Sequence, residues 1–290
     1  MKLILSRKGF DTSAGGVPSP ILPDGSLISL PIPDGGSQIR YRDLQCQVIK
    51  QNLKQNLNIG TLVKQLSRNR ITGVQGAHLD PDLIYDSYPR SPGWQPVLGQ
   101  TGSAQGHLRK QGVGEGDLFL FFGLFREAEK QGQKWRFVPG STAKHLLWGW
   151  LQIGEILAVD SLQKDIPPWL SYHPHMHGLP DANNTLYIGR DQLSINSALT
   201  AIPGSGVFSH YSDQLCLTDP GSRLPSQWRL PGWFYPEDRA PLSYHAKMER
   251  WGRDREDTLL RCAARGQEFV LDAGEYPESI SWIRDLVESA

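Results

Sequence analysis

The chain has 290 residues, 39% of them hydrophobic and 21% charged, and its 30 basic residues are balanced by 30 acidic ones. This composition indicates an ordinary globular protein, and the lack of a basic excess argues against an extended nucleic-acid-binding surface. The three cysteines are far apart and form no CxxC pair, so they indicate neither a disulfide framework nor a zinc knuckle. No apolar run is long enough for a signal peptide or a membrane span, and we expect a cytoplasmic protein.

The first part of the chain predicts a strand, a long loop and helices. Residues 2–6 suit a strand, and residues 7–36 are rich in glycine, proline, serine and aspartate, which is typical of a loop. Between residues 40 and 70, apolar residues recur every three to five positions, which predicts amphipathic helices. A second turn-rich segment covers residues 76–116.

The remainder of the chain predicts a sheet. Strands are expected at residues 117–129, 134–140, 145–161, 185–193, 206–219 and 267–274, and a closing helix at residues 277–290. Gly149 and Gly154 predict bends or bulges that curl the third of these strands. We therefore predict a single mixed α+β domain over residues 1–290, with a strand-centred, curled sheet around residues 113–158 and peripheral helices.

The segment YHPHMHG places His173, His175 and His177 at alternating positions. On an extended backbone, which Pro174 favours, this spacing points all three imidazoles the same way and suits a metal that prefers nitrogen ligands. The alternative is a histidine-rich loop whose side chains are solvated or bonded to the backbone.

The segment GAHLDPDL contains an HxD pair, His78 and Asp80, of the kind that begins the two-histidine, one-carboxylate triad of non-haem iron enzymes. The alternative is that Asp80, which precedes Pro81, opens a turn and that His78 bonds to it locally. We favour the turn unless the histidines at 173–177 lie nearby in the fold.

Two glycine-rich segments suit ligand binding. In GQTGSAQGHL, the side chains of Gln100, Gln105 and His107 can hydrogen-bond a phosphate or a base edge, although the spacing matches neither an ATP nor an NAD motif. A plain loop is the alternative. Residues 7–36 are expected to form the rim of a ligand pocket, or else a loop that is pinned by a Lys8–Asp11 pair.

The order of motifs along the chain resembles that of the nucleotide modification associated domain family, third type. The motifs that carry the resemblance are, in order, SRKGFDTSAGGVPSPILPDG, SLPIPD, HLDPDL, GQTGSAQGHL, GVGEGDLFLFFGLFR, WGWLQIGEI, HPHMHG and GQEFVLD. The resemblance covers most of the chain. It implies a role in the modification of nucleotides or DNA bases in bacteria or phages, and it assigns no residue a role. Residues 113–158 are also similar to the core of PUA-like barrels, which bind RNA or modified DNA bases.

We therefore expect a metal-dependent enzyme that acts on a nucleotide or DNA base. The alternative is a non-catalytic, PUA-like module that recognises a modified base. The expected cofactor is one divalent iron, zinc or manganese ion. The candidate residues are Asp11, His78, Asp80 and His107 for catalysis, Arg7, Lys8, Ser13, Gln100 and Gln105 for substrate, and His173, His175 and His177 for the metal.

Overall fold

The computed structural model describes residues 1–50, 53–162, 166–177, 181–196, 198–264 and 266–290. Its strands are β1 (Lys2–Arg7), β2 (Ser19–Ile21), β3 (Gln45–Lys50), β4 (Leu53–Asn58), β5 (Val97–Gln100), β6 (Leu118–Gln131), β7 (Lys134–Phe137), β8 (Lys144–Ala158), β9 (Thr185–Gly189), β10 (Gln192–Ile195), β11 (Ala198–Pro203), β12 (Ser205–Val207), β13 (Gln227–Pro231), β14 (Trp251–Asp254), β15 (Asp257–Arg261) and β16 (Glu268–Asp272). Its α-helices are α1 (Ile59–Leu66), α2 (Gly102–Lys110), α3 (Val159–Leu162) and α4 (Glu278–Glu288).

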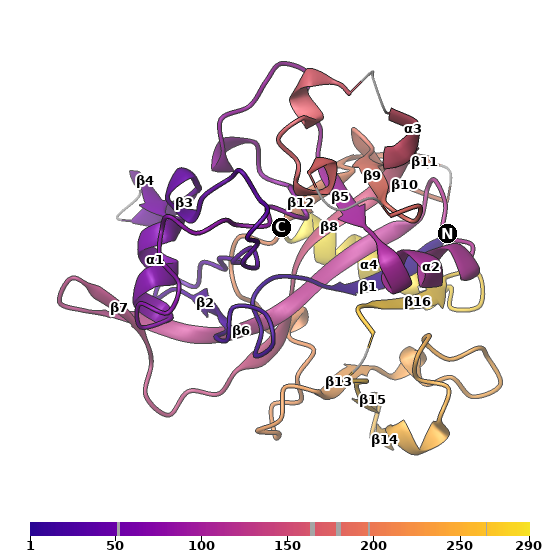
Figure 1. Cartoon of the computed structure of the whole chain (residues 1–290). Coiled ribbons are helices and arrows are strands. Elements are labelled where there is room, and N and C mark those ends of the chain that lie inside the picture. Colours follow the sequence, from indigo (N-terminus) through magenta and orange to yellow (C-terminus); the bar gives the residue numbers. More distant parts are fainter. Residues whose placement is uncertain (51–52, 163–165, 178–180, 197, 265) are drawn as a thin grey trace.

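A nine-stranded mixed sheet forms the centre of the fold (Figure 1). Its main order is β16-β1-β6-β8-β9-β5, and β2, β7 and β12 pair with the flanks of β6 and β8. Strand β1 runs parallel to β6, whereas β16 and β8 run antiparallel to their neighbours. The two longest strands, β6 and β8, consist of near-continuous apolar runs, because both faces of the sheet are covered there.

The predicted bulges in β8 are confirmed. The register against β6 skips Trp148, next to Gly149, and the register against β9 shifts between Ile153 and Glu155, on either side of Gly154. An extra residue bends a strand and increases its twist, so β8 can serve two sets of neighbours along its length. No sheet of the described residues closes into a barrel. The fold is thus mixed and strand-dominated, and the PUA-like barrel is not confirmed.

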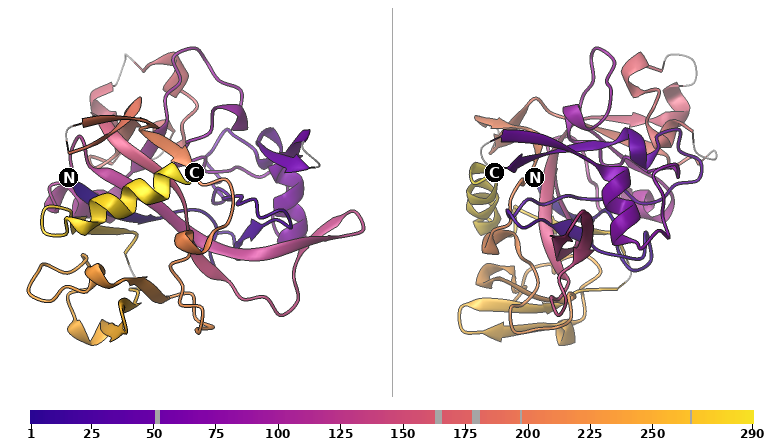
Figure 2. Two further views of the ribbon diagram at one scale, coloured as in Figure 1. Left: turned by 180° about the vertical axis from the view of Figure 1, so that it is seen from behind. Right: turned by 90° about the vertical axis from the view of Figure 1, so that its left-hand side faces the viewer.

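Different layers cover the two faces of the central sheet. Figure 2 shows α4 along one face and α1 with the N-terminal loops on the other. The predicted closing helix is confirmed as α4, whose apolar side chains, such as Ile283 and Leu286, join the same buried cluster as Leu3 and Phe119 of the sheet. A second cluster packs α1 against the N-terminal segment, with Leu62 and Phe10 fully buried.

The predicted helix before residue 58 is wrong. Residues 45–50 and 53–58 form the antiparallel pair β3–β4, in which Cys46 lies opposite Leu57 and both pack on the second cluster. Residues 51–52 of the predicted helix lie outside the described residues. Apolar residues spaced by three to five positions also include spacings of four, which a strand places on one face as readily as a helix does. The helix begins only at Ile59, after the Asn58 side chain accepts a hydrogen bond from the amide of Thr61.

Two smaller sheets, β10–β11 and β13–β15–β14, complete the fold. In the second of these, the Arg229 guanidinium bonds Asp219, Asp254 and Asp257. None of the helices in the described part of the chain is long and apolar enough to span a membrane.

Candidate metal centre

A polar cavity of about 800 Å³ opens where β1 and β5 end. Its described lining comes from parts of the chain that are distant in sequence: residues 7–14, Ile32 and Asp34, His78 and Asp80, the junction of β5 and α2 at 99–101, residues 174–175 and 181–184, and Gln267. The expectation that the opening loop forms the rim of a pocket therefore agrees with the position of Arg7, Lys8, Asp11 and Ser13 on this wall. The HxD segment and the histidine-rich segment meet here.

Asp80 lies at the centre of this meeting point, with its side chain only 3% exposed. Its Oδ2 lies 3.8 Å from Nε2 of His78 and 3.7 Å from Nε2 of His175. One ligand atom from each of these three residues lies within 4.8 Å of the others. Two imidazoles and one carboxylate that converge in this way form a donor set that transition metals and zinc accept.

The outer hydrogen bonds of the two histidines orient both rings towards this point. Nδ1 of His78 lies 2.9 Å from Oδ2 of Asp34, and Nδ1 of His175 lies 2.7 Å from Oδ1 of Asn184. Because both partners are acceptors, each Nδ1 is the donor in its hydrogen bond. In the neutral form of each ring, Nε2 then presents a lone pair towards the Asp80 carboxylate, and a cation stabilises such an arrangement.

The environment of Asp80 favours its ionised form. Burial opposes ionisation, but the close approach of His173 and the charge of Lys8 hold the pKa of Asp80 well below its usual range. The amide of Gly99 donates to Oδ1 of Asp80 at 2.6 Å and fixes that side of the carboxylate. Burial lowers the pKa of His175, which favours the neutral imidazole that a metal requires.

The backbone of the histidine-rich segment differs from the predicted extended strand. Residues Pro174–Met176 form a single 3₁₀ turn. The fully buried His173 directs Nε2 to 3.5 Å from Oδ1 of Asp80, where it has no hydrogen-bond partner of good geometry. His177 is exposed and its Nε2 lies 2.7 Å from the carbonyl of Ser171. The turn thus brings His173 and His175 to Asp80 and directs His177 away from it.

Gly99 provides the space that His175 occupies. A Cβ at Gly99 would lie 2.3 Å from Cδ2 and 2.6 Å from Nε2 of His175. Real Cβ atoms essentially never make contacts this short. The glycine in β5 therefore lets the imidazole lie flat against the strand, directly beside the amide that bonds Asp80.

Lys8 joins this centre to a buried glutamate. Its Nζ lies 3.6 Å from Oε1 of Glu268. The same oxygen accepts a hydrogen bond from the side-chain amide of Gln100. Burial raises the pKa of Glu268, against the effect of the Lys8 charge. Lys8 therefore pairs with Glu268, and the predicted pairing with Asp11 is wrong. Asp11 instead accepts hydrogen bonds at 2.6–2.7 Å from Ser13 and Ala14, which close the turn of the rim.

The other predicted residues serve different contacts. The Arg7 guanidinium bonds the carbonyls of Ala263 and Ala264, so much of its charge faces backbone. The predicted loop after Gln100 forms helix α2, which directs Gln105 and His107 away from the cavity. Gln105 accepts from the Tyr187 hydroxyl at 2.8 Å, and Nε2 of His107 lies 2.9 Å from Oγ of Ser243.

Sequence reasoning missed Asp34, Asn184, Gly99 and Glu268. Glu268 could have been noticed in the sequence, because it is a charged residue directly before the apolar residues of the segment EFVLD and lies within a motif of the family resemblance. Asp34 precedes two glycines and looks like a turn residue, which it also is, since its carboxylate accepts the amide of Gly36. Asn184 and Gly99 gave no local signal of their contact with His175.

Comparison with known proteins gives one family. No curated protein and no solved structure matches the chain. The family model of nucleotide modification associated domain 3 matches residues 2–272, which include every residue of the metal centre described above. The match associates the chain with nucleotide modification and confirms the resemblance in its ordered motifs. The chain therefore belongs to the nucleotide modification associated domain 3 family.

Proposed function

We propose that the polar cavity is the active site of an enzyme that modifies a nucleotide or a DNA base with the help of one divalent metal ion. The observation that carries the proposal is the convergence of Nε2 of His78, a carboxylate oxygen of Asp80 and Nε2 of His175 within 4.8 Å. The proposal changes the predicted ligand set: His175 remains, His78 and Asp80 become ligands, and His173 and His177 are not included.

The donor set and its surroundings fit a metal. Two imidazoles and one carboxylate leave coordination positions open, so that a bound iron(II), zinc or manganese ion can act there as a Lewis acid or activate a co-substrate. Asp34 and Asn184 hold the histidine tautomers, as outer hydrogen-bond partners do in metal sites.

The remaining residues of the wall supply binding and positioning. His173 lies next to Oδ1 of Asp80, whereas His78 and His175 face Oδ2, and His173 thereby orients the carboxylate. Lys8 balances the charges of Asp80 and Glu268 and lines the cavity, where its ammonium can also donate to a substrate oxygen. Asp11 and Ser13 shape the rim through which the substrate enters.

The experiment is elemental analysis of untagged protein purified without oxygen, with matched histidine variants. We expect about one metal ion per chain in the wild type and in His177→Ala, and loss of the metal in His78→Ala and His175→Ala. Asp34→Asn should keep the fold and lower metal affinity about 10- to 100-fold. Retention of metal by both His78→Ala and His175→Ala would refute the assignment. A metal-free wild type that still binds nucleosides would favour a base-recognition module instead.

A further inference from the structure

A second cavity, of about 330 Å³ and mostly apolar, lies on the other side of the Asp80–Pro81 segment. We propose that this apolar cavity binds the uncharged ring of the substrate base, next to the metal centre. The proposal rests on the proposed function and adds to it the part of the substrate that the protein recognises.

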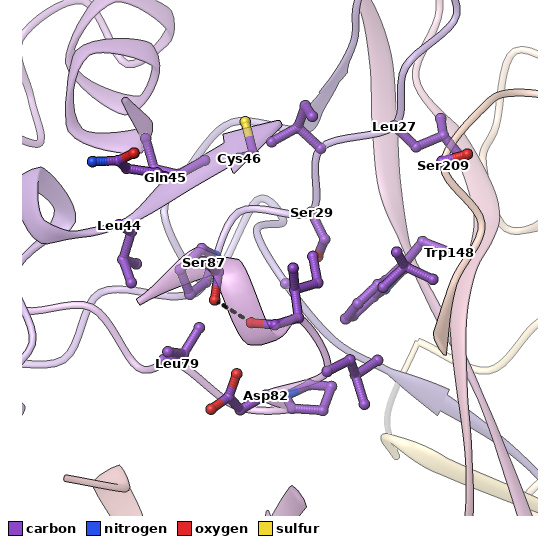
Figure 3. Close-up of a pocket in the computed structure, with 18 of the residues that line it drawn as sticks. Leu27, Ser29, Leu44, Gln45, Cys46, Leu79, Asp82, Ser87, Trp148 and Ser209 are labelled. Carbon is purple, nitrogen blue, oxygen red and sulfur yellow. Dashed lines mark hydrogen bonds between the residues drawn. The ribbon is translucent and has the colours of Figure 1, made fainter. Parts of the chain in front are cut away.

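The walls of the apolar cavity suit a flat ring. Figure 3 shows Trp148 on one side and Leu44 and Leu79 on the other, with the thiol of Cys46 above them. Side chains of this kind contribute contact area to both faces of a planar ligand. The volume is at the lower end of the range for ligand pockets, about 300–1,000 Å³, which suits a ring without its sugar and phosphate.

The charges around the apolar cavity exclude a phosphate. No lysine or arginine is among its described lining residues. Asp82 lines it, but its carboxylate is bonded to Arg90 at 2.6 Å and to the Tyr172 hydroxyl at 2.5 Å. The polar cavity, by contrast, contains the cationic side chains of Arg7 and Lys8. A nucleotide therefore fits with its ring in the apolar cavity and its polar part in the larger one.

The two cavities share a wall, which places such a ring beside the metal. Gly9 and Asp80 line both of them. Gly9 has a φ of +89°, and a Cβ there would lie 2.9 Å from Oγ of Ser29. Because Gly9 has no side chain, it does not cover the Ser29 hydroxyl at this shared wall, and that hydroxyl is available as a donor or acceptor for a ring edge. The edge that faces Gly9 and Asp80 also faces the metal centre.

The test fills the apolar cavity by changing a residue that lines this cavity and not the polar one. Val207, on β12, lines it, and Val207→Phe should occupy the space of the ring. Val74→Phe is the matched control, because Val74 is 60% exposed. Binding of the four 2′-deoxynucleosides and of a single-stranded oligodeoxynucleotide with all four bases is measured by calorimetry, together with metal content and thermal unfolding. A second, smaller change, Ser29→Ala, covers the case in which Val207→Phe fails to fold.

We expect the wild type and Val74→Phe to bind at least one of these probes. Val207→Phe should weaken that binding at least about tenfold, and Ser29→Ala about threefold, with metal content unchanged. If both variants bind as the wild type does, the proposal about the apolar cavity is overturned, while the metal assignment stands. A wild type that holds metal but binds none of the probes has the same meaning. Loss of binding in Val207→Phe by a protein that never holds metal would support the apolar cavity and refute the metal-dependent function.

Discussion

Replacement of Gly99 by alanine should remove the metal while leaving the fold in place. The new Cβ would lie 2.3 Å from Cδ2 of His175, whereas ordinary van der Waals contact starts at 3.4 Å. The imidazole must therefore move by about 1 Å. A metal–nitrogen bond of about 2.0–2.1 Å tolerates a change of only about 0.2 Å, so this movement breaks the bond.

The expected magnitude follows from the loss of one of three ligands. Disturbing an outer hydrogen-bond partner already costs about 10- to 100-fold in metal affinity, so Gly99→Ala should cost at least about 100-fold. The assay is competition with a chelator of known affinity, followed by the metal that remains on the protein. The amide of Gly99, which donates to Asp80, is unchanged by the substitution, and its φ does not lie in the left-handed region.

Gly106→Ala serves as the matched control. Gly106 lies in α2 with no atom within 4 Å of the position of its Cβ, so alanine should keep the metal and stabilise the helix by about 1 kcal/mol. If Gly99→Ala holds metal within about threefold of the wild-type affinity, His175 is not a ligand and the reasoning about the site fails.

Two further predictions concern stability. His245 is fully buried, and burial lowers its pKa to about 4, so below about pH 6.5 the unfolded chain takes up a proton at this residue while the folded chain does not. This residue alone should therefore lower the free energy of unfolding by about 2 kcal/mol between pH 7 and pH 5. Urea unfolding at both pH values checks this, and an equal fall in His245→Gln would contradict it. Arg90→Met leaves the Asp82 charge buried and should cost about 3–5 kcal/mol. The exposed pair Arg136–Glu129 should lose at most about 1 kcal/mol in Arg136→Met, and similar losses in both variants would refute the distinction.

The central sheet could be predicted because its strands are long and uniformly apolar. Strand β6 has eight consecutive buried residues from Leu118 to Phe125. A run without polar residues cannot form a surface helix, which needs a polar face. The glycines of β8 marked its bulges correctly. Residues 45–58 could not be assigned in this way, because a short segment of mixed polar and apolar residues satisfies both periodicities, and pairing with its own hairpin partner decided the outcome.

The candidate site was predictable only where its residues are close in sequence. His78 and Asp80 gave the HxD signal, but the third ligand comes from a segment almost a hundred residues away, and the sequence could not show that the two segments meet. Pro174 misled the assignment of backbone conformation, since proline fits the first turn of a helix as well as an extended chain. Because the two-residue repeat of an extended strand was assumed for residues 173–177, His177 looked equivalent to His175.

The order of strands in the central sheet has a consequence for the biosynthesis of the site. Strand β1, which leads into Lys8, lies between β6 and β16, and Glu268 sits on the last of these strands. The ribosome therefore releases the first wall of the cavity some 260 residues before the strand that neutralises Lys8. Until β16 is added, β1 has an unpaired edge and Lys8 lacks its carboxylate partner. A chain that ends before residue 268 would therefore contain the three candidate ligands but leave the Lys8 ammonium without its carboxylate partner.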